Sequence, residues 1–305
     1  MIPLQVRSFF RKLFLFLLIF ALLDFMAGSA LRYFYFRVKS GLYARTTYAL
    51  NSVDKDLLIF GSSRACDHYS SQTIEKEWGP SFYNVGEGGQ RIFYHLSLLR
   101  GILKRYSPKV IILNLDFDDF DTSREAYDRL SALLPYYRPH PEIRDIIDLK
   151  SKFEKFKRYS QIYPFNSMIF SIVAGDIFKR SLDDRGYEPL YHVWEAPLEK
   201  KEFKQTAVDE VKVKAYQDFI SEAVGSGAHV FVVVGPYYIK FNFAGSPTLK
   251  IASLIAQKNG AVFIDYSQDK IFLDHREFFY NADHLNDQGA KVFTKIVISA
   301  VKRDL

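Results

Sequence analysis

Short runs of consecutive apolar residues recur along the chain, and each ends at a glycine, an aspartate or a polar turn. Such runs are typical of strands that are buried on both faces, as in a parallel sheet covered by helices. Segments with apolar residues at helical spacing fill the gaps between them. The alternation predicts an α/β fold with a doubly wound, mostly parallel sheet of five strands. The strands are expected at residues 57–60, 81–85, 110–115, 230–234 and 261–264, and the main helices at 91–105, 208–224, 247–258 and 290–301.

The alternation breaks between residues 120 and 207, which we interpret as a helical and aromatic insertion in an α/β domain of residues 37–305. Prolines punctuate its first part, and the apolar spacing of residues 141–159 predicts one amphipathic helix there. Basic and aromatic residues mix at 150–159. That mixture suits a bilayer or a glycan, and the plainer alternative is the solvated face of a helix.

Residues 13–31 form an apolar stretch with one charge, Asp24. As a helix this stretch reaches roughly 28 Å, about the thickness of a bilayer core. We therefore predict a membrane anchor at residues 1–36, although the small residues at 28–30 also fit the cleavage site of a signal peptide. A short basic tail before a first helix normally stays inside, and a long following domain crosses regardless of its charge. The prediction is a single pass with an extracytoplasmic main domain.

The net charge of +6 suits nucleic acid, anionic lipid or an acidic glycan as partner. The chain has no recognition helix, zinc-finger spacing or RNA-binding signature, so nucleic acid is not expected. The single cysteine, Cys66, excludes an intramolecular disulfide, and we interpret it as a small packing residue and not as a nucleophile.

Two polar segments at opposite ends of the chain carry the candidate chemistry. Strand 57–60 ends at Gly61-Ser62-Ser63-Arg64, and His284 lies in a polar loop after the last predicted strand. Loops that follow parallel strands lie at one edge of the sheet, so Ser63 and His284 can meet there. Serine is a poor nucleophile without an adjacent base, and histidine is the usual base near neutral pH. The plain alternatives are a helix-capping turn for the serines and a surface or core role for His284.

Three segments, in this order, resemble the sequence blocks of the SGNH (GDSL-type) hydrolases and their acyltransferase relatives. Gly61-Ser62-Ser63 resembles the Gly-Asp-Ser block, residues 84–89 resemble a block of Asn, four residues and Gly, and residues 281–289 resemble Asp-x-x-His followed by Leu and Gly. The resemblance covers roughly residues 55–300, apart from the insertion. It implies a flavodoxin-like fold without cofactor or metal.

The same resemblance implies roles for individual residues. Ser63 would be the nucleophile and His284 the base, and the backbone amides of Ser63 and Gly89 would form an oxyanion hole. The third block of the family, Gly-x-Asn-Asp, is replaced by an acidic run in which Asp118 stands at the Asn position. A carboxylate accepts and does not donate hydrogen bonds, so Arg64 is a further candidate donor. This acidic run, residues 116–121, lacks the EF-hand glycine and glutamate, so we predict a polar loop and no metal.

The last block departs from the family pattern as well, because Asn281 stands where the family has the aspartate that orients the histidine. An amide oxygen can orient the imidazole, but it stabilises imidazolium less than a carboxylate does. Asn281 or Asp283 would then orient His284, or the site would work as a dyad.

Family members with such blocks and an anchor resemble bacterial envelope acyl-transfer proteins, which partner a polytopic membrane-bound O-acyltransferase. The resemblance implies a serine esterase or O-acyltransferase of the bacterial inner membrane, acting on an acylated cell-envelope glycan or acyl donor. The alternative is a catalytically inactive accessory protein that keeps the fold and binds a glycan or the O-acyltransferase partner.

Overall fold

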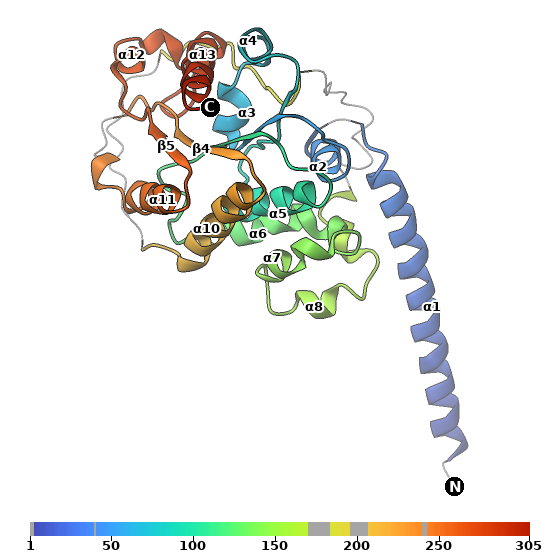
Figure 1. Ribbon diagram of the computed structural model, residues 1–305. Helices are drawn as coiled ribbons and strands as arrows, with labels where there is room; N and C mark the ends of the chain where they lie inside the picture. Colours follow the sequence, from blue (N-terminus) through green and yellow to red (C-terminus); the bar gives the residue numbers. More distant parts are fainter. Residues whose placement is uncertain (1–2, 40, 170–183, 196–206, 240–242) are drawn as a thin grey trace. The chain divides into compact units, whose positions relative to one another are not determined.

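The computed structural model describes residues 3–39, 41–169, 184–195, 207–239 and 243–305 (Figure 1). Contacts between residues divide it into two units. Unit 1 comprises Met1–Ala44 and Ser131–Arg180, and unit 2 comprises Arg45–Leu130 and Ser181–Leu305. The sequence-based domain boundary at residue 36 and the insertion at residues 120–207 stay predictions.

The sheet of unit 2 confirms the predicted α/β class. It has five strands, all parallel, in the order β2-β1-β3-β4-β5. Every residue of β1 and β3 is buried, as expected for strands whose apolar side chains must be covered on both faces. The strands are β1 (Leu57–Phe60), β2 (Phe82–Asn84), β3 (Val110–Asn114), β4 (His229–Val234) and β5 (Val262–Asp265).

Helices cover both faces of this sheet, which gives the doubly wound arrangement (Figure 1). On one face α10 packs against α5 and α11, and on the other α13 packs against α3 and α4. The first group is α5 (Ile92–Leu103), α10 (Glu210–Gly225) and α11 (Pro247–Lys258), and the second is α3 (Ser63–His68), α4 (Ser71–Glu77) and α13 (Asp287–Arg303). Shorter elements of unit 2 are α6 (Glu125–Asp128), η4 (Phe243–Gly245), α12 (Lys270–Leu273) and η5 (Arg276–Phe278).

The strand order creates a crevice at the carboxyl ends of β1 and β3. The chain leaves β1 towards β2 on one side and later returns to β3 on the other side, so the loops after β1 and β3 diverge. Open α/β sheets bind ligands at such a switch point. Ser63 follows β1 at this crevice. The loop before α13 ends in a helix cap, in which the Asn286 side chain accepts the Gly289 N–H at 3.0 Å. This cap fixes the end of the loop that carries His284.

Unit 1 is built around α1 (Leu4–Tyr35), a helix long and apolar enough to span a membrane or to serve as a signal sequence. The single helix predicted at residues 141–159 is wrong. The Ser151 side chain accepts the Phe153 N–H, and this local hydrogen bond competes with a continuous helix. The segment instead forms η2 (Pro141–Ile143), α7 (Arg144–Asp148) and α8 (Glu154–Lys157), followed by η3 (Tyr163–Phe165). Two further elements, α2 (Gly41–Asn51) and η1 (Arg129–Tyr136), contain the points at which the chain passes between the units.

Candidate active site

Ser63 and His284 lie in contact although 221 positions separate them in the sequence. The Ser63 Oγ atom is 2.8 Å from Nε2 of His284, and Nδ1 of His284 is 3.1 Å from Oδ1 of Asn281. Ser63 is the first residue of α3, directly after the turn that ends β1. That turn needs a glycine, because Gly61 has a φ of 143° and a Cβ there would lie 2.7 Å from the Asn114 carbonyl oxygen.

The hydrogen bonds of Asn281 determine the tautomer of His284. The backbone N–H groups of Asp283 and His284 both donate to Asn281 Oδ1 at 2.8 Å, so this atom is the amide oxygen. The imidazole must therefore carry its proton on Nδ1 to bond with it. Nε2 keeps a free lone pair, which accepts the Ser63 hydroxyl proton, and this is the tautomer that a general base needs.

Asp283 and Gly89, two other residues singled out from the sequence, line the same cavity as Ser63 and His284. Asp283 bonds to Asn281 through its backbone, and its carboxylate acts on His284 through the electrostatic field. Gly89 has a φ of 72°, which favours glycine, and a Cβ there would lie 2.5 Å from the Arg129 side chain. The glycine therefore lets the loop after β2 pass close to the Arg129 side chain.

Arg64 also lines the cavity, but both of its Nη atoms are engaged. Nη1 lies 3.2 Å from Asp116 Oδ1 and Nη2 donates to the Pro236 carbonyl at 2.9 Å. The guanidinium stacks on the ring of Tyr237, 3.5 Å from its centroid. Its buried Nε has no hydrogen-bond partner within the described residues. Arg64 is therefore held rigidly, with its buried Nε–H uncommitted.

A buried carboxylate, Asp116, ties the loops after β1, β3 and β4 together. It accepts the Ser62 hydroxyl at 2.6 Å and the Tyr237 hydroxyl at 3.3 Å, and it pairs with Arg64. Burial alone would raise the pKa of Asp116, but Arg64 and Arg91 outweigh it, and the pKa is lowered. Ser62 therefore anchors the Ser63 turn to an ionised group in the loop after the neighbouring strand, β3.

Arg91 balances the charge of the acidic run after β3. Its Nη1 atom lies 3.5 Å from Asp116, 3.1 Å from Asp118 and 2.8 Å from Asp119. The carboxylate oxygens of these three aspartates lie within 4.8 Å of one another, so they need a nearby cation. The guanidinium supplies it. Asp118, which stands where the resemblance expects a hydrogen-bond donor, is thereby neutralised beside the cavity.

Burial keeps the base neutral. Desolvation and the neighbouring Arg64 lower the pKa of His284 below its usual value of 6.5. A second histidine, His68, is fully buried, and desolvation lowers its pKa well below the usual value. The Nε2 atom of His68 accepts the Leu285 N–H at 2.9 Å, so it holds the residue that follows His284.

Cys66 lies outside this chemistry. Its thiol is buried and donates to the Ser63 carbonyl at 3.2 Å and to Asp67 at 3.3 Å. Burial raises the pKa of the thiol, which disfavours the nucleophilic thiolate. The burial of its side chain supports a packing role.

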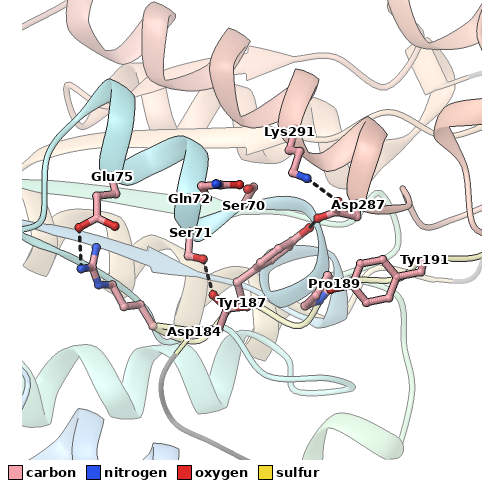
Figure 2. Close-up of a pocket in the computed structure, with 11 residues that line it drawn as sticks. Ser70, Ser71, Gln72, Glu75, Asp184, Tyr187, Pro189, Tyr191, Asp287 and Lys291 are labelled. Atoms are coloured by element: carbon pink, nitrogen blue, oxygen red, sulfur yellow. Dashed lines mark hydrogen bonds and ion pairs between the residues drawn. The ribbon is translucent and has the colours of Figure 1, made fainter.

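The cavity in front of Ser63 has a volume of about 170 Å³. A larger one, of about 490 Å³, lies where residues of α4, the 184–191 segment and the start of α13 converge (Figure 2). Four of its charged side chains form pairs, Glu75 with Arg185 at 2.9 Å and Asp287 with Lys291 at 2.6 Å, and a fifth, Asp184, accepts the Ser71 hydroxyl (Figure 2). Neither Ser63 nor His284 lines it. We therefore place the candidate chemistry in the smaller cavity.

The sequence analysis did not identify Arg91, Tyr237 and His68 as site residues. For the first two, the sequence position itself indicated a role. Arg91 is the N-cap residue of α5, where a positive charge opposes the helix dipole, so another role was indicated. Tyr237 follows a central strand, at the sheet edge where Ser63 was sought. Only the side-chain packing shows the role of His68.

Comparisons with known proteins bear on the fold only. No family model and no curated protein matches the chain. Among solved structures, a Bacteroides fragilis protein described as a "putative acylhydrolase" is 13% identical with a TM-score of 0.40, covering 84% of this chain and 95% of that one. The protein YxiM of Bacillus subtilis is 13% identical with a TM-score of 0.44, covering 82% of this chain and 57% of that one. We transfer no residue role from either, so the site rests on its own geometry.

Proposed function

We propose that the chain is an SGNH-type serine hydrolase or acyltransferase in which Ser63 forms an acyl-enzyme. One observation carries the proposal: the Ser63 Oγ–His284 Nε2 distance of 2.8 Å, with His284 held by Asn281 in the tautomer that accepts a proton. A nucleophile, a base and an orienting group in hydrogen-bond contact are the signature of nucleophilic catalysis.

The reaction begins when Ser63 Oγ attacks the carbonyl carbon of an ester and its proton passes to Nε2 of His284. The tetrahedral intermediate then breaks its bond to the leaving alcohol, which takes the proton from His284. Water or a sugar hydroxyl next attacks the acyl-serine ester. His284 accepts the proton of that attacking group and returns it to Ser63 Oγ. Hydrolysis and transfer share the first half of this cycle.

The developing oxyanion needs donors beside Ser63. We assign the Ser63 and Gly89 backbone N–H groups, because both residues line the cavity. The guanidinium groups of Arg64 and Arg91 offset the charges of the neighbouring aspartates, which would otherwise oppose the oxyanion. Asp118, paired with Arg91, no longer opposes the negative charge as a free carboxylate would.

The substrate in this proposal is an O-acylated glycan of the cell envelope, or the acyl donor for one. The resemblance of the sequence blocks and the apolar helix α1 support this choice, since α1 is long enough to place the chain at a bacterial inner membrane. A polytopic membrane-bound O-acyltransferase is the partner that the same resemblance suggests.

One observation favours a second candidate, an inactive accessory protein with this fold. Asn281 lacks the charge that stabilises an imidazolium in the family pattern. Such a protein would bind a glycan or the membrane partner and would not activate Ser63. The two candidates differ in one measurable property, the reactivity of the Ser63 hydroxyl.

The test is labelling of the full chain in detergent with a fluorophosphonate, followed by mapping of the modified peptide. We expect modification at Ser63, lost in Ser63→Ala and in His284→Ala. Ser221→Ala, an exposed serine on α10, is the matched control and should label like the wild type. If the folded wild-type chain stays unlabelled while a reference serine hydrolase reacts, the accessory role is the better account.

A further inference from the structure

Along α1, every side chain from Leu4 to Leu23 is exposed, and Asp24 is the first that is partly covered. The Asp24 carboxylate accepts hydrogen bonds from Ser160 Oγ at 2.6 Å, from the Gln161 N–H at 2.6 Å and from the Ile162 N–H at 3.3 Å. Asp24, the one charged residue of the apolar stretch, therefore binds the loop of residues 160–162 to the helix.

The loop lies directly against the helix backbone. Gly28, one turn after Asp24, is buried, and a Cβ there would lie 2.3 Å from the Gln161 side chain. At 1.5 Å per residue, Asp24 lies roughly 16 Å from Leu13 and roughly 10 Å from Leu31, the ends of the apolar stretch. If α1 spans a bilayer of roughly 30 Å, the docked loop lies towards the interface at the Leu31 end.

Gln161 connects this loop to a basic cavity. Its backbone N–H bonds to Asp24 on the helix, and its side-chain oxygen accepts a hydrogen bond from Arg138. Arg138 lines a cavity with a volume of about 280 Å³. The lining residues are three arginines and two tyrosines: Tyr137, Arg138, Arg144, Arg158 and Tyr159.

The three arginines are oriented by neutral groups. Arg144 donates to the carbonyl oxygens of Tyr137 and Arg138, at 2.7 and 3.0 Å, and Arg158 donates to the Tyr137 hydroxyl at 2.6 Å. Arg138 donates to the Arg158 carbonyl at 3.3 Å as well as to Gln161. In the described part of unit 1, none of the three forms an ion pair with a carboxylate. Two carboxylates act on them less directly: Asp24 interacts electrostatically with Arg138, and Asp148 accepts the Tyr137 hydroxyl to which Arg158 donates. Three guanidinium groups against two carboxylates leave a positive charge that can attract an anion.

The surface around the cavity is aromatic as well as basic. Phe153 is 54% exposed, Phe156 70% and Tyr159 76%. The acid of this stretch, Glu154, is buried and pairs inward with Lys157 and the Tyr163 hydroxyl. Exposed aromatic rings beside cations are typical of the zone between lipid headgroups and acyl chains.

We propose that the cavity lined by Arg138, Arg144 and Arg158 binds the phosphate group of an anionic phospholipid, with the exposed rings in and beside α8 seated among the acyl chains. Guanidinium groups match phosphate geometry with paired hydrogen bonds, and three of them in one cavity select an anionic headgroup. The docking of Gln161 on Asp24 holds the cavity beside the half of the apolar stretch that ends at Leu31. This site does not depend on the serine chemistry of unit 2.

The experiment is a titration of the full chain in detergent with phosphatidylglycerol or phosphatidylcholine of identical acyl chains, followed by native mass spectrometry. Both lipids carry the phosphate, but the trimethylammonium group of phosphatidylcholine adds a positive charge that the three guanidinium groups repel. We therefore expect one phosphatidylglycerol to bind about tenfold more tightly than phosphatidylcholine, a difference of about 1.4 kcal/mol. Arg144→Gln/Arg158→Gln should abolish this preference. Lys152→Gln/Lys155→Gln, which removes the same charge from exposed positions outside the cavity, should keep most of it.

Three results would overturn the proposal: equal binding of the two lipids, equal losses in the two double variants, or displacement of the lipid by equimolar inorganic phosphate or glycerol 1-phosphate. The last would identify a soluble phosphate as the ligand. Arg158→Lys guards against a folding artefact, because it keeps the charge and should retain more of the lipid preference than Arg158→Gln. If the two single variants unfold at the same temperature yet bind phosphatidylglycerol equally, the arginine is not a ligand.

Discussion

Asn281 Oδ1 lies 3.1 Å from Nδ1 of His284 and also accepts the backbone N–H groups of Asp283 and His284. The amide therefore fixes both the loop and the tautomer of the imidazole without carrying charge. The electrostatic help for the imidazolium that forms during catalysis comes from Asp283 and Asp116, both of which raise the pKa of His284.

Replacing Asn281 by aspartate should return the charge that the family pattern has at this position. A carboxylate beside the imidazole favours the protonated form, so the pKa of His284 should rise by about one unit or more. We expect the acid limb of the labelling rate to move to higher pH by that amount in Asn281→Asp. Rates of fluorophosphonate labelling between pH 4 and 9 measure it, with Asn281→Ala as the control that removes the orienting oxygen. A limb that stays in place or moves to lower pH would show that Asn281 does not face the base in solution.

The wild-type chain should still be labelled at pH values below 6.5. Burial and Arg64 lower the pKa of His284, so the neutral, proton-accepting form persists to lower pH than in a free histidine. Asp283→Asn removes a charge that favours the imidazolium, and its acid limb should lie lower still. Labelling rates of the two proteins across the same pH range test both expectations. An acid limb above pH 6.5 in the wild type would contradict the burial argument.

His68 should act as a positioning residue for the base. Its Nε2 atom accepts the buried Leu285 N–H, next to His284. His68→Phe leaves that N–H unpaired and should cost about 1–3 kcal/mol in the free energy of unfolding, whereas His68→Gln keeps an acceptor and should cost less. Urea unfolding measures the cost. The labelling rate separates positioning from mere stability, because it should fall in His68→Phe and recover in His68→Gln at temperatures where both variants are folded.

The same histidine predicts a loss of stability in acid. The folded pKa of His68 lies well below 6.5, so below that pH the unfolded chain binds a proton that the folded chain excludes. Above pH 6.5 this group does not change the free energy of unfolding. Below pH 6.5 the free energy of unfolding falls by up to 1.4 kcal/mol per pH unit. His68→Gln removes the group and should flatten the dependence between pH 6.5 and 5, as read from urea midpoints. An unchanged slope would mean that other groups carry the acid sensitivity.

The sheet and the Ser63–His284 contact follow from simple rules. All five strands were predicted, because continuous apolar runs ending at polar residues are an unambiguous signal for buried parallel strands. The contact was predicted because loops after parallel strands lie at one edge. The pairing of Arg91 with the aspartates depends on side-chain packing between the β2–α5 and β3–α6 loops, which no local pattern reports. The break at Ser151 was missed because the apolar spacing continues through it.

Arg91 should matter for stability more than any other surface-reaching arginine of unit 2, because three carboxylates converge on it. Burial raises the pKa of Asp119 even with Arg91 beside it, so removing the guanidinium leaves neighbouring negative charges uncompensated. Arg91→Gln should cost about 3 kcal/mol of unfolding free energy at pH 8. Arg100→Gln is the matched control; it breaks one pair with the part-exposed Glu222 and should cost less than about 1 kcal/mol.

The pH dependence of that cost identifies its cause. Without Arg91 the carboxyl pKa values rise above those of the unfolded chain, so the folded variant takes up protons first and its deficit shrinks as the pH falls from 8 to 5. The difference in urea midpoint between the wild type and Arg91→Gln should therefore narrow across this range, while that of Arg100→Gln stays nearly constant. A deficit of Arg91→Gln that is equally large at pH 5 would assign the loss to packing of the arginine side chain. In that case the charge argument for Asp118 beside the Ser63 cavity would fail as well, since the Arg91 guanidinium is the group that pairs with both Asp118 and Asp119.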